Sequence, residues 1–416
     1  MQLTDFDRQL IAGEHGPAAG FAMDVLLNFA RAVRAPRLLD ITRAHIDGCL
    51  YHGQVSLDFV NRLVEHGGRV CVPTTLNVGA MDLLHPTLVR TAGPEREAAQ
   101  KLMQAHLELG CEPSFTCAPY QTRFRPQFGE QIAWGESNAI VFANSVIGAR
   151  TNRYGDFIDL CCAITGRAPA FGLHLDEGRR GQVLFRLRGF ADAQASDATF
   201  VGVGYLVGER SGLRVPVIDG LPRPHSEDQL KALGAVAAST GSVALFHAVG
   251  ITPEALTVRD AFGPNGIPEE TIDIHPEHIE DALRRLSTVP DGTPISAVSL
   301  GTPHFSVEEF RSLSHLVTGF RPAEGVHVYV NTNRETYAAL ETSEMFSQIQ
   351  KAGLIVVTDT CTYVTAIIRP DKGVIMTNSG KWAHYAPANL GVDVAFGTLE
   401  ECLLSAAAGR VVRTTK

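Results

Sequence analysis

The C-terminal half of the chain alternates between short apolar runs and longer segments whose apolar residues follow helical spacing. The apolar runs, rich in β-branched residues, cover residues 243–246, 295–300, 326–330 and 354–357. The segments with helical spacing cover residues 277–286, 306–316 and 334–351. Ser306 and Glu309 match a capping box at a helix start. Buried strands alternating with helices predict a parallel sheet with helices on its faces.

The N-terminal half shows a looser form of the same alternation. Helical spacing covers residues 20–33, 57–66, 95–109 and 157–165. Strand-like runs cover residues 37–41 and 68–73, and residues 183–187 and 200–206 are strands or glycine-spaced apolar segments. Ser56 either caps the helix at 57–66 or, with Gly53, forms an anion site at its start. The whole pattern predicts an α/β protein with mostly parallel sheets.

Polar residues follow the predicted strands at the point where each strand ends. In the C-terminal half these are Gly301–His304, Asn331–Arg334 and Thr358–Cys361, and Thr74–Asn77 follows the run at 68–73. Ligands of parallel α/β sheets bind at the carboxyl ends of the strands. We therefore expect a site at this edge.

Composition excludes several classes of protein. The formal net charge of −9 argues against sequence-independent nucleic-acid binding, which needs a basic face. No uncharged apolar run is long enough to span a membrane, and the first residues lack the apolar region of a secretory signal. Eight irregularly spaced cysteines favour reduced thiols or metal ligands over a disulfide framework. We expect a cytoplasmic protein.

The 416-residue length allows more than one domain. We expect an N-terminal helical and turn-rich segment at 1–66, an α/β domain at 67–222 and a second α/β domain at 223–416. The turn after the strand-like residues 214–222 sets the second boundary, and the domains can interleave.

Familiar catalytic motifs are missing, which leaves the cysteines as the main chemical signal. The chain has no P-loop, dinucleotide fingerprint, Gly-x-Ser-x-Gly elbow or His-Glu-x-x-His. Cys117 and Cys361 each follow a predicted strand, where a thiolate can ligate iron. The alternative is that both are small buried hydrophobes, which is also how we interpret Cys161 and Cys162.

Four further residues admit both a structural and a functional interpretation. Glu136 and Ser137 either cap a helix or contact a ligand. Arg150, flanked by Gly148 and Asn152, suits a carboxylate or phosphate, or is a surface charge. Lys381, in a polar loop broken by Gly380, suits an anionic substrate, or is a solvated lysine.

In order along the chain, these segments resemble the large subunit of aconitase X over nearly the whole length. The resemblance is carried by Thr74–Asn77, Thr116–Tyr120, Trp134–Asn138, Gly148–Arg153, Ala163–Arg167, Gly301–His304, Asp359–Cys361 and Asn378–Lys381. It implies an iron-sulfur hydro-lyase of the aconitase superfamily, with three-layer α/β domains and a cluster site at the carboxyl ends of strands.

The resemblance also implies roles for individual residues. Cys117 and Cys361 match metal ligands. The residues that match substrate-contacting positions are Gly53, Gln54, Val55, Ser56, Asn77, Glu136, Ser137 and Lys381. Thr302 stands where phosphomevalonate enzymes have a third cysteine, so a smaller cluster or a bound iron is implied, with Cys162 or His304 as replacement ligand.

The implied reaction is dehydration of cis-3-hydroxy-L-proline to pyrroline-2-carboxylate. Lys381 or Arg150 would hold the carboxylate, Glu136 would take the charge of the ring amine, and Lys381 and Glu136 are the catalytic candidates. A serine of a small swivelling-domain subunit would be the general base, which makes that subunit the expected partner. The alternatives are another hydroxy acid, such as 5-phosphomevalonate, and a non-catalytic iron-sulfur regulator.

Overall fold

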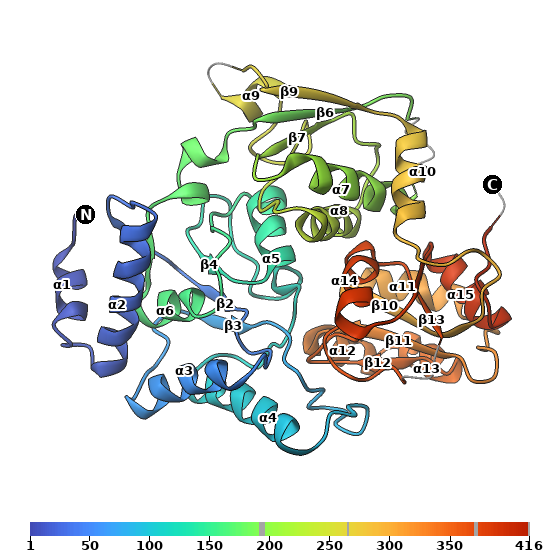
Figure 1. Cartoon of the computed structure of the whole chain (residues 1–416), viewed down its shortest axis with the longest axis horizontal. Coiled ribbons are helices and arrows are strands. Elements are labelled where there is room, and N and C mark those ends of the chain that lie inside the picture. The colour runs from blue at the N-terminus through green and yellow to red at the C-terminus, as the bar shows by residue number, and fades with distance from the viewer. Residues whose placement is uncertain (191–195, 264–265, 370–372, 415–416) are drawn as a thin grey trace. The chain divides into compact units, whose positions relative to one another are not determined.

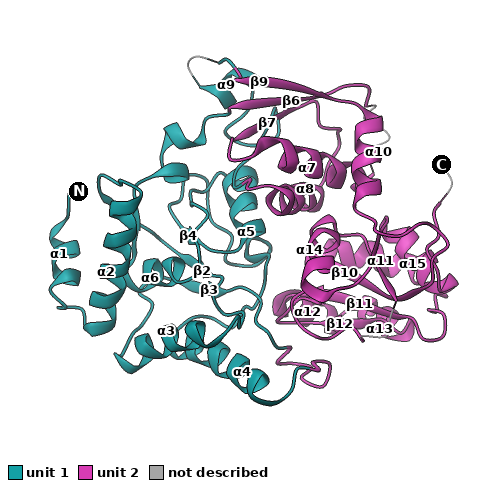
Figure 2. Ribbon diagram, in the orientation of Figure 1, with its two compact units in different colours: residues 1–81, 91–181, 244–267 teal, residues 82–90, 182–243, 268–416 magenta. Residues whose placement is uncertain are grey.

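The chain forms two compact units in a computed structural model that describes residues 1–190, 196–263, 266–369 and 373–414 (Figure 1). Each unit is assembled from segments that are separate in the sequence (Figure 2). Unit 1 comprises Met1–Met81, Thr91–Gly181 and Ala244–Ile267, and unit 2 comprises Asp82–Arg90, Gln182–Val243 and Pro268–Lys416. The division at 1–66, 67–222 and 223–416 stays a prediction, and its last two residues lie outside the described part.

Unit 1 is built from helices around short strands. Its helices are α1 (Asp5–Ile11), α2 (Pro17–Ala32), α3 (Gln54–Glu65), α4 (Gly93–Glu108), α5 (Ser137–Phe142), α6 (Ile158–Thr165) and α9 (Val258–Phe262). Its strands are β1 (Leu38–Asp40), β2 (Ala44–Ile46), β3 (Thr74–Leu76), β4 (Ala133–Trp134), β5 (Arg167–Pro169) and β8 (His247–Ala248). Short 3-10 or π turns are η1 (Pro119–Gln121), η2 (Ala143–Ile147), η3 (Gly172–His174) and η4 (Asp176–Arg179). Strand β2 pairs in parallel with β3 and β4, and β1 pairs antiparallel with β5.

Unit 2 contains the predicted parallel sheet. Its strands are β6 (Val183–Leu187), β7 (Pro216–Asp219), β9 (Glu270–Ile274), β10 (Ile295–Phe305), β11 (His327–Thr332), β12 (Ile355–Val357), β13 (Val374–Thr377) and β14 (Val394–Phe396). Its helices are α7 (Asp197–Ser211), α8 (Glu227–Thr240), α10 (Pro276–Arg285), α11 (Val307–Leu316), α12 (Arg334–Glu341), α13 (Glu344–Lys351), α14 (Gly380–Leu390) and α15 (Leu399–Ala408). The order β12-β11-β10-β13-β14 is parallel throughout. Strand β6 pairs in parallel with β7 and β9.

The two faces of the larger sheet differ in chemistry. Val298 and Leu300 of β10 join an apolar cluster that includes buried residues of α11, α12, α13 and α15. Ser299, between them, points to the opposite face, where its hydroxyl bonds to that of Thr362 at 2.6 Å. Helices α11, α12, α13 and α15 therefore cover an apolar face, and the opposite face carries the polar pair of Ser299 and Thr362. Ser306 caps α11 with Glu309 in the predicted capping box.

Strand predictions are wrong at three places in the core pattern, residues 200–206, 68–73 and 243–246. Residues 200–206 lie in helix α7, where Gly204 allows a close approach of α8: a Cβ on Gly204 would meet the Leu233 carbonyl oxygen at 2.3 Å. At 68–73 the backbone bonds to helix ends instead, with Val70 N donating to Leu109 O. In the run at 243–246, Phe246 N donates to the Ser145 hydroxyl at 2.8 Å, so a side chain replaces a strand partner.

Two helix predictions need adjustment. The segment 334–351 forms two helices, because α12 ends at Glu341 with Thr342 as its C-cap and Ser343 is the N-cap of α13. Ser56 is not the N-cap of its helix, since α3 begins at Gln54 with Gly53 in that position. Among the described residues, no helix combines the length and the apolar character that crossing a membrane requires.

Candidate metal centre and substrate site

His304 lies near the end of strand β10 and is fully buried. The strand is irregular between Leu300 and Phe305, and Gly301 has φ +80 with its position for a Cβ only 2.2 Å from Asn331 O. Only glycine fits there, so Gly301 specifies the bend that turns His304 inward. The His304 Nε2 donates to the Thr360 carbonyl at 3.1 Å. A carbonyl only accepts, so the ring proton is on Nε2 and the lone pair is on Nδ1.

Cys361 lies in a loop that follows strand β12 and is held on both sides. Asp359, a non-glycine residue at φ +61, accepts two hydrogen bonds from Arg334, at 2.6 and 2.8 Å. The backbone N and hydroxyl of Thr358 both donate to Asp82 at 2.9 Å. Buried Thr362 bonds to Asn331 and Trp382 as well as Ser299, so the loop is fixed by paired polar groups.

Cys117 lies in unit 1 and is also buried. The predicted strand before it is absent, and its segment is fixed by single contacts instead. Thr116 N donates to Leu76 O at 3.0 Å, and Asn138 Nδ2 donates to the Cys117 carbonyl at 2.8 Å. Asn138 is held in turn by the Tyr120 hydroxyl.

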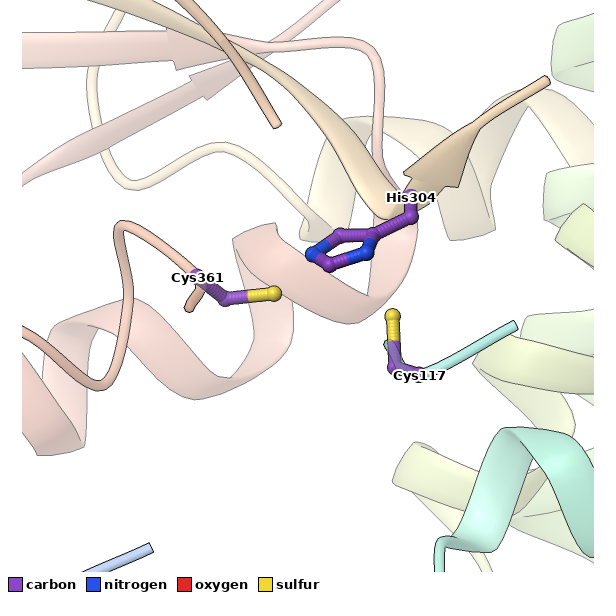
Figure 3. Close-up of side chains that lie close together, drawn as sticks. All are labelled: Cys117, His304 and Cys361. Atoms are coloured by element: carbon purple, nitrogen blue, oxygen red, sulfur yellow. The ribbon is translucent and has the colours of Figure 1, made fainter. Parts of the chain in front are cut away.

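These three side chains form a candidate metal-binding group. The ligand atoms of Cys117, His304 and Cys361 all lie within 4.8 Å of one another, and all three residues are buried. Figure 3 shows the two sulfur atoms and the imidazole turned toward a common point. Thiolate and imidazole are ligands for iron, iron-sulfur clusters and zinc. His304, held only as an alternative from the sequence, is the third member.

The other residues considered as ligands lie differently. Thr302 is buried, and its hydroxyl oxygen has no hydrogen-bond partner among the described residues. Cys162 lies inside helix α6 of unit 1, and burial raises the pKa of its thiol well above the ordinary value, so it is a protonated packing residue. Cys161 shares that helix, and burial raises the pKa of its thiol as well.

Lys381 lies at the N-terminus of helix α14, against a cavity of unit 2 of about 220 Å³. Ser379 caps the helix, accepting from Trp382 N at 3.0 Å, and Lys381 is 3% exposed. The interpretation of Lys381 as a solvated loop residue is therefore wrong. A helix N-terminus beside a lysine attracts anions.

In unit 1, Glu136 and Ser137 start helix α5. Glu136 is its N-cap, accepting from Ala139 N at 2.7 Å, and Ser137 donates to Glu136 at 3.2 Å. The capping interpretation is therefore confirmed, while a ligand contact stays a prediction. Asn77 follows strand β3 and donates to Asp47, while its own side-chain oxygen is buried and has no partner among the described residues.

The remaining substrate candidates differ in exposure and charge. Gly53 and Gln54 start α3, Val55 is 67% exposed and Ser56 is buried. The positive charge of Arg150 is balanced within unit 1, because its guanidinium pairs with Asp176 at 2.5 Å and lies 3.8 Å from Glu254. Those carboxylates account for its charge.

Unit 1 also contains a buried carboxyl, that of Asp159, which the sequence patterns did not reveal. Asp159 accepts from Asp47 N at 2.8 Å and from Leu160 N at 2.7 Å. Burial raises the pKa of Asp159 to about 8, so this carboxyl is mostly protonated at neutral pH. Asp47 directly follows β2, and a polar residue at the end of a strand was the available signal.

Family models match the chain in three consecutive stretches. The aconitase X first domain matches residues 1–177, the second domain 181–284 and the third domain 295–408. The chain belongs to the aconitase X family. This confirms the family that the motifs predicted.

Relatives within the aconitase X family include two kinds of dehydratase. A cis-3-hydroxy-L-proline dehydratase from Pseudomonas aeruginosa is 43% identical over 412 residues, which are 98% of this chain and 70% of that protein. One from Hypocrea jecorina is 40% identical over 98% of this chain and 69% of that protein. The phosphomevalonate dehydratase large subunit of Methanosarcina mazei is 32% identical over 99% of this chain and 98% of its own.

A solved structure supports the same fold. The chain matches aconitase X of Thermococcus kodakaraensis in its holo-form with a TM-score of 0.87 and 31% identity, over 98% of this chain and all of that one. The predicted aconitase-like α/β fold is therefore confirmed. Because the curated relatives are dehydratases, this member of the aconitase X family is a hydro-lyase.

Proposed function

We propose that this chain is the large subunit of an aconitase X enzyme that dehydrates cis-3-hydroxy-L-proline to pyrroline-2-carboxylate. The choice of substrate rests on the difference in sequence identity between this chain and its relatives. The two cis-3-hydroxy-L-proline dehydratases are 43% and 40% identical to this chain, against 32% for the large subunit of Methanosarcina mazei.

The charges around the cavity beside Lys381 favour the same substrate. Its lining includes four carboxylates, on Asp197, Asp228, Glu308 and Glu309, and only two lysines, Lys231 and Lys381. Lys231 is already paired with carboxylates. A phosphate dianion would meet an excess of negative charge, whereas an amino acid carries only one carboxylate.

Cys117, Cys361 and His304 would hold an iron or a small iron-sulfur cluster. The donor set fits this group, because the thiols are buried and the Nε2 hydrogen bond leaves the lone pair of His304 on Nδ1. When bound, the iron supplies a Lewis acid for the departing hydroxyl. The uncharged Thr302 is a poorer ligand than His304, which we propose as the third. Eight unbridged cysteines and such a centre suit a reducing cytoplasm.

The protein's own groups would bind and orient the substrate. Lys381 and the first turn of α14 would hold the carboxylate, and Glu136 would face the ring ammonium. Asn77, Ser137 and the start of α3 at 53–56 would complete the contacts. In the reaction the Cα proton leaves to a base, its electron pair forms the double bond to C3, and the C3 hydroxide leaves and is protonated to water.

The base would come from a small swivelling-domain subunit. Two observations support this partner. The chain spans 98% of the Methanosarcina mazei protein, which is named a large subunit, but 70% of the Pseudomonas aeruginosa dehydratase. The remaining part of the longer relative is what a separate subunit would contribute here.

Anaerobic co-expression with the small subunit, followed by assay of pyrroline-2-carboxylate formation, tests the proposal. Turnover of cis-3-hydroxy-L-proline that needs both chains and iron is the expected result. Turnover of 5-phosphomevalonate instead would replace the substrate and keep the reaction class. A metal-loaded complex that dehydrates neither compound would favour the regulatory alternative.

A further inference from the structure

Lys231 is a charged side chain that is almost fully buried in unit 2. It lies on helix α8 and is 1% exposed. Its ammonium contacts Glu309 at 2.5 Å, Asp228 at 2.8 Å and the main-chain carbonyl of His304 at 3.2 Å. A lysine has three N–H donors, so each of them has an acceptor.

The acceptors of Lys231 belong to a network of hydrogen bonds and ion pairs that includes the His304 carbonyl. Glu309 also accepts from Ser306 N at 2.8 Å, and the Ser306 hydroxyl donates to Asp228 at 2.8 Å. Helix α8, the start of helix α11 and the end of strand β10 are therefore tied together through one ammonium group. The network fixes the last residues of β10 relative to both helices.

Stability alone does not explain this arrangement. Burying a lysine and two carboxylates is expensive, and replacing buried ion pairs with apolar residues of similar volume is often neutral or stabilising. What an apolar side chain cannot do is donate a hydrogen bond to the His304 carbonyl. The ammonium thus provides a directional contact to the main chain of one residue.

We propose that Lys231 is a positioning residue that sets the orientation of His304 toward the metal. The inference rests on the metal centre of the proposed function. The ammonium holds the main chain of His304, and the Thr360 carbonyl holds Nε2 of its ring. With the main chain and Nε2 both held, the imidazole is fixed beside the two cysteines before the metal arrives. Residues that orient a metal-ligating histidine in this way typically change affinity by about 10–100-fold when replaced.

The test compares metal binding by the full chain, co-expressed with its small subunit, for wild type and Lys231→Met. Methionine keeps most of the volume but removes the three donors. Fe²⁺ affinity is measured by competition with a chelator, and Co²⁺ absorption reports the ligand set. We expect Lys231→Met to bind Fe²⁺ about 10–100-fold more weakly, with an altered Co²⁺ spectrum that indicates loss of the nitrogen ligand.

Two further variants separate positioning from general stability. Ser306→Ala breaks the network without touching His304, so its Fe²⁺ affinity should equal that of wild type. Glu309→Gln keeps an acceptor for Lys231 and should weaken binding in the same direction by a smaller factor. It provides the measurement if Lys231→Met does not fold.

Each outcome decides one point. Wild-type affinity and spectrum in Lys231→Met, with only a lower Tm, would show a structural role and overturn the inference while leaving the metal centre intact. If Lys231→Met does not fold, unchanged binding in Glu309→Gln would do the same. Absence of metal binding in the wild type would overturn the centre itself and the inference with it.

Discussion

Replacing Gly204 by alanine sets two effects of known sign against each other. Gly204 lies in α7 where that helix packs on α8. Alanine improves helix propensity by about 0.5–1 kcal/mol. Its Cβ, however, would lie 2.3 Å from the Leu233 carbonyl oxygen, where ordinary contact begins at 3.4 Å. The helices would have to separate by the difference, about 1 Å, because a main-chain carbonyl cannot rotate away as a side chain can.

The clash should outweigh the gain in propensity. Overpacking of this size costs about 1–3 kcal/mol, so after the gain in propensity unit 2 is destabilised by up to about 2.5 kcal/mol. For a unit of roughly 200 residues that is a fall in Tm of up to about 10 °C. Calorimetry of the full chain measures it, and hydrogen exchange in α7 and α8 peptides locates it. Because α8 carries Lys231, the variant should also weaken the hold on His304.

A matched control comes from helix α2. A Cβ on Gly20 would lie 3.5 Å from Leu10 O, an ordinary contact, so Gly20→Ala should stabilise unit 1 by about 0.5–1 kcal/mol. A Gly204→Ala chain that unfolds at or above the wild-type temperature would refute the argument from backbone contact.

Three further predictions concern the candidate site and its surroundings. Cys361→Ser should abolish iron absorption and turnover together, whereas Cys402→Ser, a buried cysteine in α15 outside the site, should leave both unchanged. Lys381→Met should lower kcat/KM for cis-3-hydroxy-L-proline by about 10–100-fold, the worth of a charged hydrogen bond, and full activity would exclude it from substrate binding. Asp159 has a raised pKa of about 8, so between about pH 4 and 8 the folded state keeps a proton that the unfolded state has lost. The free energy of unfolding should therefore fall as pH rises over that range. Asp159→Asn should flatten the dependence of Tm on pH over that range, and an unchanged slope would show that another group titrates.

Sequence patterns predicted the sheet of unit 2 because its determinants are local. Runs such as 295–300 and 354–357 are β-branched and apolar, and Ser306 with Glu309 signals a helix start. The segment 200–206 failed for a reason of tertiary structure. Gly204 makes room for the backbone of α8 and Gly202 for Ile279 of α10, and no local pattern reveals those neighbours.

The candidate site was predictable only in part. Cys117 and Cys361 were candidates from their positions after predicted strands, and only the resemblance favoured metal ligation over packing. His304 was only an alternative ligand, because its alignment depends on the bend at Gly301. Lys231 was missed altogether. A lysine in a helix usually lies on the solvated face, and the carboxylates that bury this one come from α8 itself and from α11.

The segment Asp82–Arg90 has a consequence for the order in which the protein forms during synthesis. It belongs to unit 2, where Asp82 receives both hydrogen bonds from Thr358, and Arg90 N donates to Ala366 O. Its partners leave the ribosome some 270 residues later. Unit 1 likewise cannot be completed until Ala244–Ile267 has been synthesised. Neither unit can therefore be completed as an early folding intermediate, and the Cys361 loop closes on Asp82 only when the chain is nearly finished.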